Sequence, residues 1–488
     1  MFKHVITTAS LLFSMLLTVN PSHLRAQAPV LSLDIPEIIE QSRADNAFWS
    51  VIVRDTTGKI LEGFNIGKLV RPASNLKLLT SATVLNELGA DYTYRTVMYG
   101  LGYQNGSSWE GNIIIRGSGD PSISGKYYNE DRFYVFNKFY KALKAMGIEE
   151  INGNLVGNDA FFDQQPYPKG WAWNDLSFYY GVETSALSFN NNTVDLTVYA
   201  DGDIGDTPEI EWFPFDTDYV KFVNEQVISP AESEYDEFYR RLMGTNRIIL
   251  RSKLPQNYVE HEALSVLNAS RFFIDTFKKY LEDGNISVNG RLIVESQQQD
   301  WNSDQYKILA VHESVPLRKL LQQLNKESDN FYAEMLLKTS AAEHFDISGS
   351  TELGIMLMKD FSASIGLDTT KMELSDGSGM AASTLITVKN LSKLLVEMRD
   401  HHQFEVYKNS LSISGVDGSL EYRFPASMVG KIYGKTGYVS GVRSLSGYME
   451  SSSGKPLIFC VVANNYTKET SYIDYVQEKI IQKIYRSY

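Results

Sequence analysis

The stretch Pro72-Ala73-Ser74-Asn75-Leu76-Lys77 places a serine and a lysine three positions apart at the start of an apolar segment. Apolar residues recur after it at helical spacing until Gly89, which predicts a helix beginning near Ser74 and ending before the glycine. Residues three apart share one helix face, so Ser74 and Lys77 should lie about one turn apart. A serine becomes nucleophilic when a neighbour takes its proton, and a lysine can do this when burial or a nearby cation lowers its pKa. The pair therefore predicts nucleophilic catalysis.

Two further short motifs follow in the chain. Ser328-Asp329-Asn330 begins another segment with apolar residues at helical spacing, and Lys435-Thr436-Gly437 lies in a strand-like run, residues 432–442. Each motif alone is weak, because serines often cap helices and lysines are usually solvated. Their order and their contexts, two helix starts and a strand, make the set specific.

The lysine of the third motif has two candidate tasks. The charge of Lys435 could keep Lys77 neutral, and it offers a positive site for an anionic end of a substrate. Thr436 offers a hydroxyl to the same carboxylate. The backbone N–H groups of Ser74 and Tyr438 could form an oxyanion hole.

The second motif supplies polar side chains for the same reaction. Ser328 could relay a proton between Lys77 and the leaving amine, and Asn330 could hold an amide of the substrate. Taken together, Ser74, Lys77, Ser328 and Asn330 are the candidate catalytic residues.

Composition and charge restrict the class of protein. The chain has 488 residues, 43% of them hydrophobic, which suits a folded protein of about three domains. Its net charge of −13, without a basic stripe, argues against a nucleic-acid partner. The single cysteine, Cys460, lies in an apolar strand-like run and is expected to be a buried packing residue.

The N-terminal segment, residues 1–28, is typical of a cleaved signal peptide. A polar start precedes an apolar run that ends near Val19, and Ala26-Gln27-Ala28 resembles a cleavage site. The run is too short and too polar for a good membrane span, and no later stretch approaches one. We therefore expect an exported protein whose membrane contact is at most peripheral.

The spacing of structural segments predicts a divided catalytic domain. Short strand-like runs rich in glycine, asparagine and aromatic residues fill the middle of the chain, and helices dominate beyond about residue 264. We expect catalytic parts at residues 29–90 and 286–488, around a mainly β insertion of one or two modules at residues 91–285.

The motif set resembles that of the active-site serine penicillin-binding proteins, and more narrowly of the class C low-molecular-mass D-alanyl-D-alanine carboxypeptidases/endopeptidases. The first two motifs are 254 positions apart (328 − 74), which is similar to the inserted domains of this family and far more than in β-lactamases. Further stretches similar to family elements are Arg116–Pro121, Gly153–Asp159, Gly170–Asp175, Ser185–Asn190 and Asp376–Gly379.

This resemblance implies an α+β fold of the penicillin-recognising (β-lactamase/transpeptidase-like) type, with an antiparallel sheet flanked by helices. It implies cleavage of peptidoglycan stem peptides in the periplasm through an acyl-enzyme on Ser74, with Lys77 as the base and Lys435 and Thr436 binding the D-alanine carboxylate. β-Lactams would inhibit the enzyme by acylating Ser74. No cofactor and no catalytic metal are expected.

The chain departs from the family pattern beside the side-chain pocket. The family often has an arginine shortly after Asp376–Gly379, where this chain has Met380-Ala381-Ala382. Asp175 and Tyr180 resemble the rest of that pocket, in which the aspartate would hold the side-chain amine of the third stem residue. A preference for meso-diaminopimelate is therefore left open. Tyr438 is bulkier than the residue usual after the third motif, although the oxyanion role needs only its N–H.

Two other classes of function remain as alternatives. A β-lactam-hydrolysing enzyme or esterase on the same fold would need a deacylating base, and we can place no equivalent in the sequence. A non-catalytic peptidoglycan-binding protein would not need a nucleophile with a base.

Overall fold

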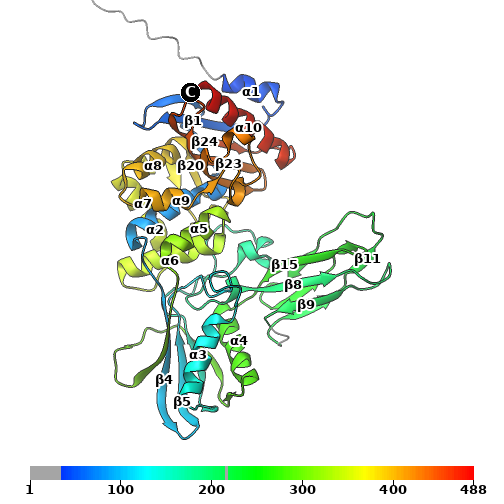
Figure 1. The fold of residues 1–488 in the computed structure, drawn as a ribbon, viewed down its shortest axis with the longest axis vertical. Coiled ribbons are helices and arrows are strands. Elements are labelled where there is room, and N and C mark those ends of the chain that lie inside the picture. The colour runs from blue at the N-terminus through cyan, green and yellow to red at the C-terminus, as the bar shows by residue number, and fades with distance from the viewer. Residues whose placement is uncertain (1–33, 215–217) are drawn as a thin grey trace, which may run out of the picture.

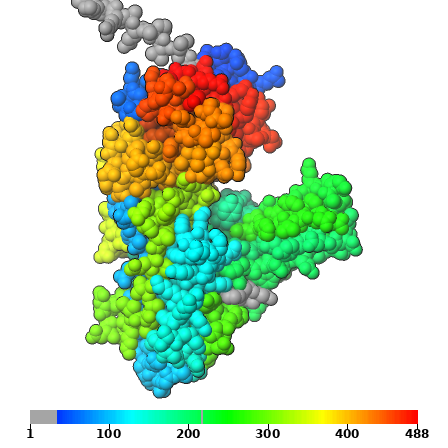
Figure 2. All heavy atoms as spheres, in the orientation of Figure 1, coloured from blue at the N-terminus to red at the C-terminus, as the bar shows by residue number. Residues whose placement is uncertain are grey.

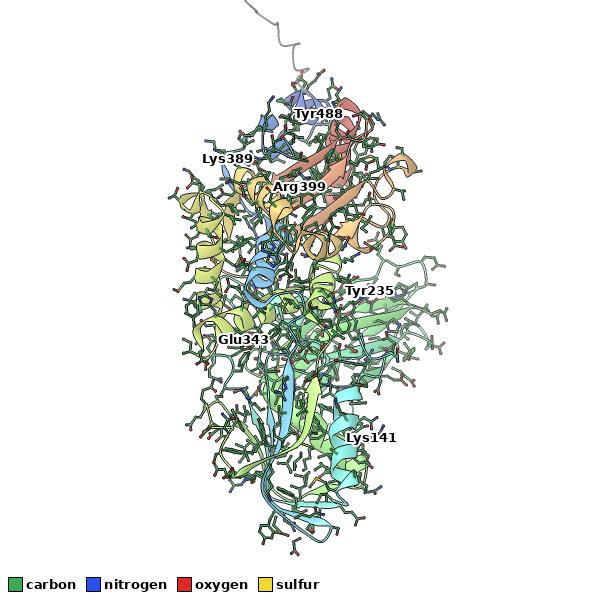
Figure 3. All side chains as sticks on the ribbon, turned by 60° about the vertical axis from the view of Figure 1, so that its left-hand side comes forward. Lys141, Tyr235, Glu343, Lys389, Arg399 and Tyr488 are labelled. Atoms are coloured by element: carbon green, nitrogen blue, oxygen red, sulfur yellow. The ribbon has the colours of Figure 1, made fainter. Side chains whose placement is uncertain are left out.

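The computed structural model describes residues 34–214 and 218–488, so the predicted signal peptide lies outside the described residues. The molecule is elongated (Figure 1), with a helix-covered sheet at one end, a second sheet at the other, and a β arm that projects from the side. Figure 2 shows the arm as a separate projection from the body. In Figure 3, Lys389 and Arg399 mark the catalytic end, Lys141 marks a helix that packs on the second sheet, and Tyr235 marks the arm.

A six-stranded antiparallel sheet forms the centre of the catalytic domain. Its innermost strand is buried on both faces: Leu457, Phe459 and Val461 point to one side, and Ile458 and Cys460 to the other. Cys460 is free and buried, as predicted from its apolar run. The strands, in spatial order, are β2 (Ile60–Phe64), β1 (Phe48–Asp55), β24 (Pro456–Asn464), β23 (Val442–Glu450), β22 (Ile432–Val439) and β21 (Ser412–Ile413).

Helices cover both faces of this sheet, which confirms the predicted α+β class. The first and last helices, α1 (Ile35–Gln41) and α10 (Thr470–Ser487), pack together on one face. A larger helical layer covers the other face, and a small sheet borders it. The layer contains α2 (Lys77–Leu88), α5 (Leu317–Lys326), α6 (Asn330–Phe345), α7 (Thr351–Ser364), α8 (Val388–Asp400) and α9 (Phe404–Asn409); the small sheet contains β3 (Leu69–Val70), β19 (Met372–Glu373) and β20 (Leu385–Thr387).

A seven-stranded mixed sheet forms the end of the molecule remote from the catalytic domain. Two helices, α3 (Tyr134–Ala145) and α4 (Ala269–Asp283), pack on it through phenylalanine side chains, and the rings of Phe136 and Phe273 meet edge to face. The strands are β4 (Arg95–Asn105), β5 (Ser108–Arg116), β6 (Glu150–Asn152), β7 (Leu155–Asn158), β16 (Ser287–Val288), β17 (Leu292–Glu295) and β18 (Tyr306–Glu313).

This sheet corrects one predicted boundary. We expected the insertion to end at residue 285, but β16, β17 and β18 all follow that position and hydrogen-bond to strands of the insertion. The hydrogen bonding of the insertion therefore continues to Glu313. Two of the three strands, β16 and β17, have only two and four residues and carry too little periodicity to be assigned to one sheet or another from sequence.

The arm is built from short strands between residues 193 and 265. They form one three-stranded antiparallel sheet, one mixed three-stranded sheet and a parallel pair. The strands are β8 (Thr193–Tyr199), β9 (Glu209–Phe213), β15 (Val259–Ser265), β10 (Lys221–Asn224), β12 (Tyr239–Arg241), β13 (Arg247–Leu250), β11 (Val227–Ser229) and β14 (Lys253–Pro255). Within the described ranges, no helix is long and apolar enough to cross a bilayer.

Candidate active site

Ser74 and Lys77 lie one turn apart, as predicted, but the serine precedes the α-helix. Ser74 belongs to a 3₁₀ turn, Ala73–Leu76, that leads directly into α2. Gly379 packs against this turn with φ of +83°, and a Cβ there would come within 2.0 Å of the Ala73 carbonyl oxygen. Only glycine permits that approach, so the loop after Asp376 can lie close to the serine.

The amine of Lys77 has three partners. Its Nζ lies 2.9 Å from Ser74 Oγ, 2.6 Å from Asn330 Oδ1 and 3.1 Å from the Ser378 carbonyl oxygen. The amide and carbonyl oxygens can only accept, whereas the hydroxyl can also donate. A neutral amine has two N–H donors and one lone pair, so two acceptors and one hydroxyl match its capacity. In the neutral form the lone pair faces the Ser74 hydroxyl, whereas in the charged form Nζ donates to it.

Burial is the main reason why the amine can be neutral. Lys77 is fully buried, and burial lowers its pKa from 10.5 to about 8, although the charges of Asp376, Asp329 and Glu334 oppose this. From the sequence, we named burial and a nearby cation, for which Lys435 was the candidate, as two ways to lower this pKa. Desolvation is the first cause, since a buried cation loses its hydration.

Lys435 projects from β22 and is also fully buried. Its Nζ donates to Ser328 Oγ and to the carbonyl oxygen of Thr436, both at 2.8 Å. Burial lowers the pKa of Lys435 well below its ordinary value, and the charges of Lys77 and Arg443 lower it further. Among the described residues, no carboxylate pairs with it.

The second motif lies where α6 begins. Ser328 has φ of +61°, and Asp329 caps the helix by accepting the N–H of Tyr332. No hydrogen bond joins Lys77 to Ser328 within the described ranges, so the predicted relay has no direct link; Ser328 instead contacts Lys435. Asn330 is engaged at both ends of its amide, because its Oδ1 accepts from Lys77 and its Nδ2 donates to the Tyr180 carbonyl at 2.9 Å.

Two buried carboxylates, to which the sequence analysis gave no role, bind the loop whose Ser378 carbonyl contacts Lys77. Glu334, four residues after Asn330 on α6, accepts the N–H groups of Gly377 at 2.9 Å and Ser378 at 2.8 Å. Burial raises the pKa of Glu334 to about 8. The sequence signal that could have indicated Glu334 was a glutamate within an otherwise apolar stretch of a helix. Asp376 accepts from the side chains of Ser378 and Thr384; its motif was noted in the sequence, without a role.

Strand β22, the second strand from the edge of the sheet, approaches the nucleophile candidate closely. A Cβ on Gly437 would come within 2.9 Å of the Ser74 nitrogen and 2.3 Å of Ser444 Oγ. Asn75 Nδ2 donates to the Lys435 carbonyl at 2.8 Å and holds the turn on the strand. The Thr436 hydroxyl donates to Ser419, a residue that no sequence signal indicated. Tyr438 follows and is 55% exposed.

Asp175 and Tyr180 lie on two short 3₁₀ turns, Asp175–Ser177 and Tyr179–Gly181. Burial raises the pKa of Asp175, and burial with the charge of Asp175 raises the pKa of Tyr180 to about 12, so the two side chains interact. Met380 reaches the same place, where its sulfur lies 3.5 Å from Asn330 Nδ2. In residues 34–214 and 218–488, no cluster of three or more His, Cys, Asp or Glu side chains is arranged to hold a metal.

A serine beside a buried lysine, between a helical layer and the edge of an antiparallel sheet, is the arrangement of the active-site serine enzymes with the penicillin-recognising fold. Residues 31–482 match the D-Ala-D-Ala carboxypeptidase 3 (S13) family, and the chain belongs to that family. It is thus a serine-type D-Ala-D-Ala carboxypeptidase, as the resemblance implied.

Known relatives cover most of the chain. The D-alanyl-D-alanine carboxypeptidase of Actinomadura sp. (strain R39) is 28% identical over 462 residues, which are 91% of this chain and 82% of the relative. D-alanyl-D-alanine carboxypeptidase DacB of Haemophilus influenzae is 25% identical over 443 residues, 86% of this chain and 89% of the relative. The crystal structure of penicillin binding protein 4 from H. influenzae has the same fold, with a TM-score of 0.82 at 22% identity, covering 93% of this chain and 99% of that one. A complex of that protein with a β-lactam matches with a TM-score of 0.75 at 21% identity and the same coverage.

Proposed function

We propose that Ser74 is the nucleophile and Lys77 the general base of this carboxypeptidase. The observation that carries the proposal is the set of three partners around the Lys77 amine, which leaves one lone pair for the Ser74 proton. Lys77 takes that proton while Ser74 Oγ bonds to the carbonyl carbon of the penultimate D-alanine. The C–N bond then breaks as the leaving amine takes the proton that Lys77 holds, so Lys77 is neutral again. In the second half-reaction Lys77 takes a proton from water while the water oxygen attacks the ester, and it returns that proton to Ser74 Oγ as the ester C–O bond breaks.

The third motif binds the substrate end in this proposal. Lys435 and Thr436 hold the terminal carboxylate, and the N–H groups of Ser74 and Tyr438 stabilise the oxyanion. Burial favours the neutral form of Lys435, but a carboxylate bound beside it would favour the protonated form. Substrate binding should therefore be coupled to protonation of this lysine.

Ser328 and Asn330 assist in different ways. Ser328 contacts the Lys435 amine, so it can pass a proton toward the leaving group from that side. Asn330 holds the Lys77 amine through its Oδ1, which orients the lone pair toward Ser74. This role for Asn330 replaces the substrate-binding role that we expected from the sequence, because both ends of its amide are already bonded.

The substrates in this proposal are peptidoglycan stem peptides that end in D-alanyl-D-alanine, and also D-alanyl cross-links, which would make the protein an endopeptidase. We propose a periplasmic location, following the predicted signal peptide. Asp175 and Tyr180 would bind the side-chain amine of the third stem residue. Burial disfavours the charged form of the Asp175 carboxylate, and a bound cation would stabilise that form. β-Lactams would acylate Ser74; the β-lactam complex of the H. influenzae protein supports this.

The test is intact-mass spectrometry of the mature protein after incubation with benzylpenicillin, followed by peptide mapping. We expect a stable adduct on Ser74 in the wild type and none in Ser74→Ala, which should also lose D-alanine release while keeping its circular dichroism spectrum. Normal turnover by Ser74→Ala would refute the assignment. An adduct that forms and clears within seconds would indicate β-lactam hydrolysis instead.

A further inference from the structure

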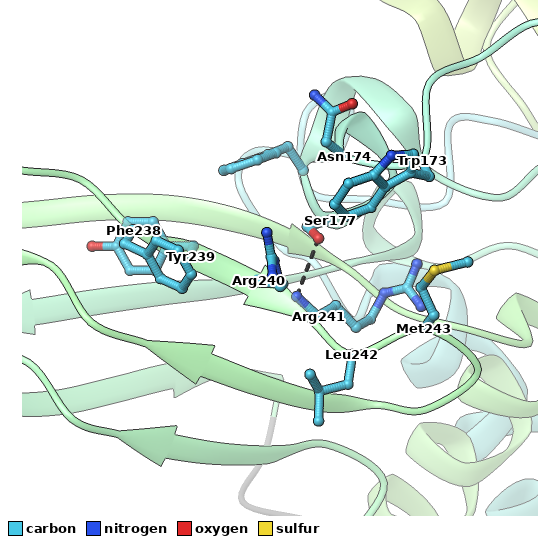
Figure 4. Close-up of a pocket in the computed structure, with 10 residues that line it drawn as sticks. Trp173, Asn174, Ser177, Phe238, Tyr239, Arg240, Arg241, Leu242 and Met243 are labelled. Atoms are coloured by element: carbon cyan, nitrogen blue, oxygen red, sulfur yellow. Dashed lines mark hydrogen bonds between the residues drawn. The ribbon is translucent and has the colours of Figure 1, made fainter.

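A pocket of about 360 Å³ lies between the arm and the loop that carries Asp175 and Tyr180. Figure 4 shows its two sides, with Trp173, Asn174 and Ser177 above strand β12. Phe238, Arg240 and Met243 form the arm side. None of these residues belongs to the three motifs.

The floor of the pocket has a rigid support. Arg241 is buried, and its guanidinium donates to Ser265 Oγ at 3.2 Å and to the Leu176 carbonyl at 2.7 Å. Its backbone N–H donates to Ser177 Oγ at 3.1 Å, the bond drawn in Figure 4. These bonds join the arm to the loop, so both sides of the pocket keep their relative position.

The neighbouring Arg240 is exposed and lies between two aromatic rings. Its guanidinium carbon is 5.4 Å from the ring centre of Trp173 and 5.5 Å from that of Phe238. Trp173 is itself 56% exposed. No carboxylate in the described parts of the chain forms an ion pair with Arg240, although the protein as a whole carries a net charge of −13. An arginine held by aromatic rings presents its planar fork to carboxylates.

The same short loop connects the pocket with the active site. Trp173, Asn174 and Ser177 precede Tyr180, whose carbonyl accepts the Asn330 amide at 2.9 Å. A substrate that reaches past Asp175 would therefore meet this pocket next. Its chemistry is an exposed aromatic face beside an unpaired cation, which suits a ring or apolar body that carries a carboxylate.

We propose that this pocket binds a carboxylate-bearing part of the peptidoglycan glycopeptide that is remote from the scissile bond. The inference rests on the proposed function and extends it, because it assigns the insertion a part in substrate selection. The protein should then distinguish a complete muropeptide from a short peptide with the same D-alanyl-D-alanine end. The two substrates should differ in KM rather than in kcat. The pocket contacts are far from the reacting atoms, so they have the same strength in the ground state and in the transition state.

The experiment compares Arg240→Ala and Trp173→Ala with the wild type on two substrates, a disaccharide pentapeptide and an N-acylated tripeptide ending in D-alanyl-D-alanine. We expect KM for the disaccharide pentapeptide to rise roughly tenfold, the usual effect of losing a charge-assisted hydrogen bond, while kcat changes less than about twofold. KM for the short peptide should stay within about twofold. Arg240→Lys, which keeps the charge but not the fork, should recover part of the loss.

Arg247→Ala is the matched control. Arg247 is an exposed arginine at the start of the adjacent strand β13, outside the pocket, and the same change in net charge there should leave both KM values unaltered. The proposal is wrong if Arg240→Ala and Trp173→Ala leave KM for the disaccharide pentapeptide unchanged, or if Arg247→Ala raises it equally. Benzylpenicillin acylation of Ser74 separates the two hypotheses. Failure of acylation in the wild type would refute the proposed function, whereas normal acylation with unchanged KM values would refute the pocket alone.

Discussion

The candidate active site and the junction between α6 and the insertion both contain fully buried lysines, but the partners of these lysines differ. In the junction, Lys338 donates to Asp163 Oδ1 at 2.6 Å and to the Gln165 carbonyl at 2.8 Å. In the candidate active site, Lys77 and Lys435 each contact a serine hydroxyl and have no carboxylate within ion-pair distance in the described part of the chain.

The difference separates a structural charge from a reactive amine. A carboxylate partner stabilises the protonated form of Lys338 and holds α6 on the insertion. A hydroxyl partner leaves the amine free to gain or lose its proton, and burial lowers the pKa of both Lys77 and Lys435. In the proposed mechanism, a buried lysine without a carboxylate partner is thus the feature that distinguishes a reactive amine from a structural one.

The largest effect should come from Lys77→Met, which keeps much of the volume and removes the amine. We expect benzylpenicillin acylation of Ser74 to slow by roughly a thousandfold or more, because the serine loses its base. Stopped-flow mass spectrometry would measure it. Acylation within about tenfold of the wild type would show that Lys77 is no more reactive than Lys338.

Lys435→Ala should lower kcat/KM roughly a hundredfold for peptides with a free terminal carboxylate. This is the usual effect of losing a buried charge-assisted hydrogen bond. Peptides with an amidated C-terminus lack the charge and should lose much less. Steady-state assays with this substrate pair measure the difference. Equal losses on both substrates would contradict the proposed carboxylate contact.

The proposed role of Lys77 predicts the pH dependence of acylation. In that proposal the base is the neutral amine, so the rate should rise with pH, about tenfold per unit below the pKa of about 8, and level off above it. A C-terminally amidated substrate has no terminal carboxylate, so the protonation of Lys435 should not affect its binding. The measurement is a comparison of the pH–rate profiles of the wild type and Lys77→Met on this substrate. A rate independent of pH between 6 and 9 would exclude Lys77 as the titrating base.

Lys338→Met should have the smallest effect on catalysis and is the matched control for Lys77→Met. Removing one partner of the ion pair leaves Asp163, 23% exposed, without its cation, and should lower the free energy of unfolding by roughly 2–3 kcal/mol. Acylation of the folded variant should stay within about threefold. Urea denaturation measures the free energy of unfolding, and the benzylpenicillin assay measures the acylation rate. A loss of acylation as large as that of Lys77→Met would show that the two buried lysines do not differ in function.

The sequence predicted the catalytic motifs and the helix and strand that carry them, because helical spacing and a glycine stop are local signals. The five candidate side chains form two hydrogen-bonded groups, with Ser74, Lys77 and Asn330 in one and Ser328 and Lys435 in the other. The support from Glu334 and Ser378 was not predicted, since it depends on a loop that follows α6 by over thirty positions. The strands up to Glu313 were missed for the same reason: strand pairing over long separations leaves no periodic trace.

Helix α6 places three side chains at intervals of four residues: Asn330 at the catalytic lysine, Glu334 at the loop behind it, and Lys338 at the insertion. All three contacts are made from the same face of the helix, because residues four apart lie one above the other. Inserting or deleting a single residue between Asn330 and Lys338 would turn one end relative to the other by about 100° and shift it by about 1.5 Å. Such a change could not preserve both the Asn330 contact with the Lys77 amine and the Lys338 contact with the insertion. This segment should therefore tolerate substitutions far better than any change in its length.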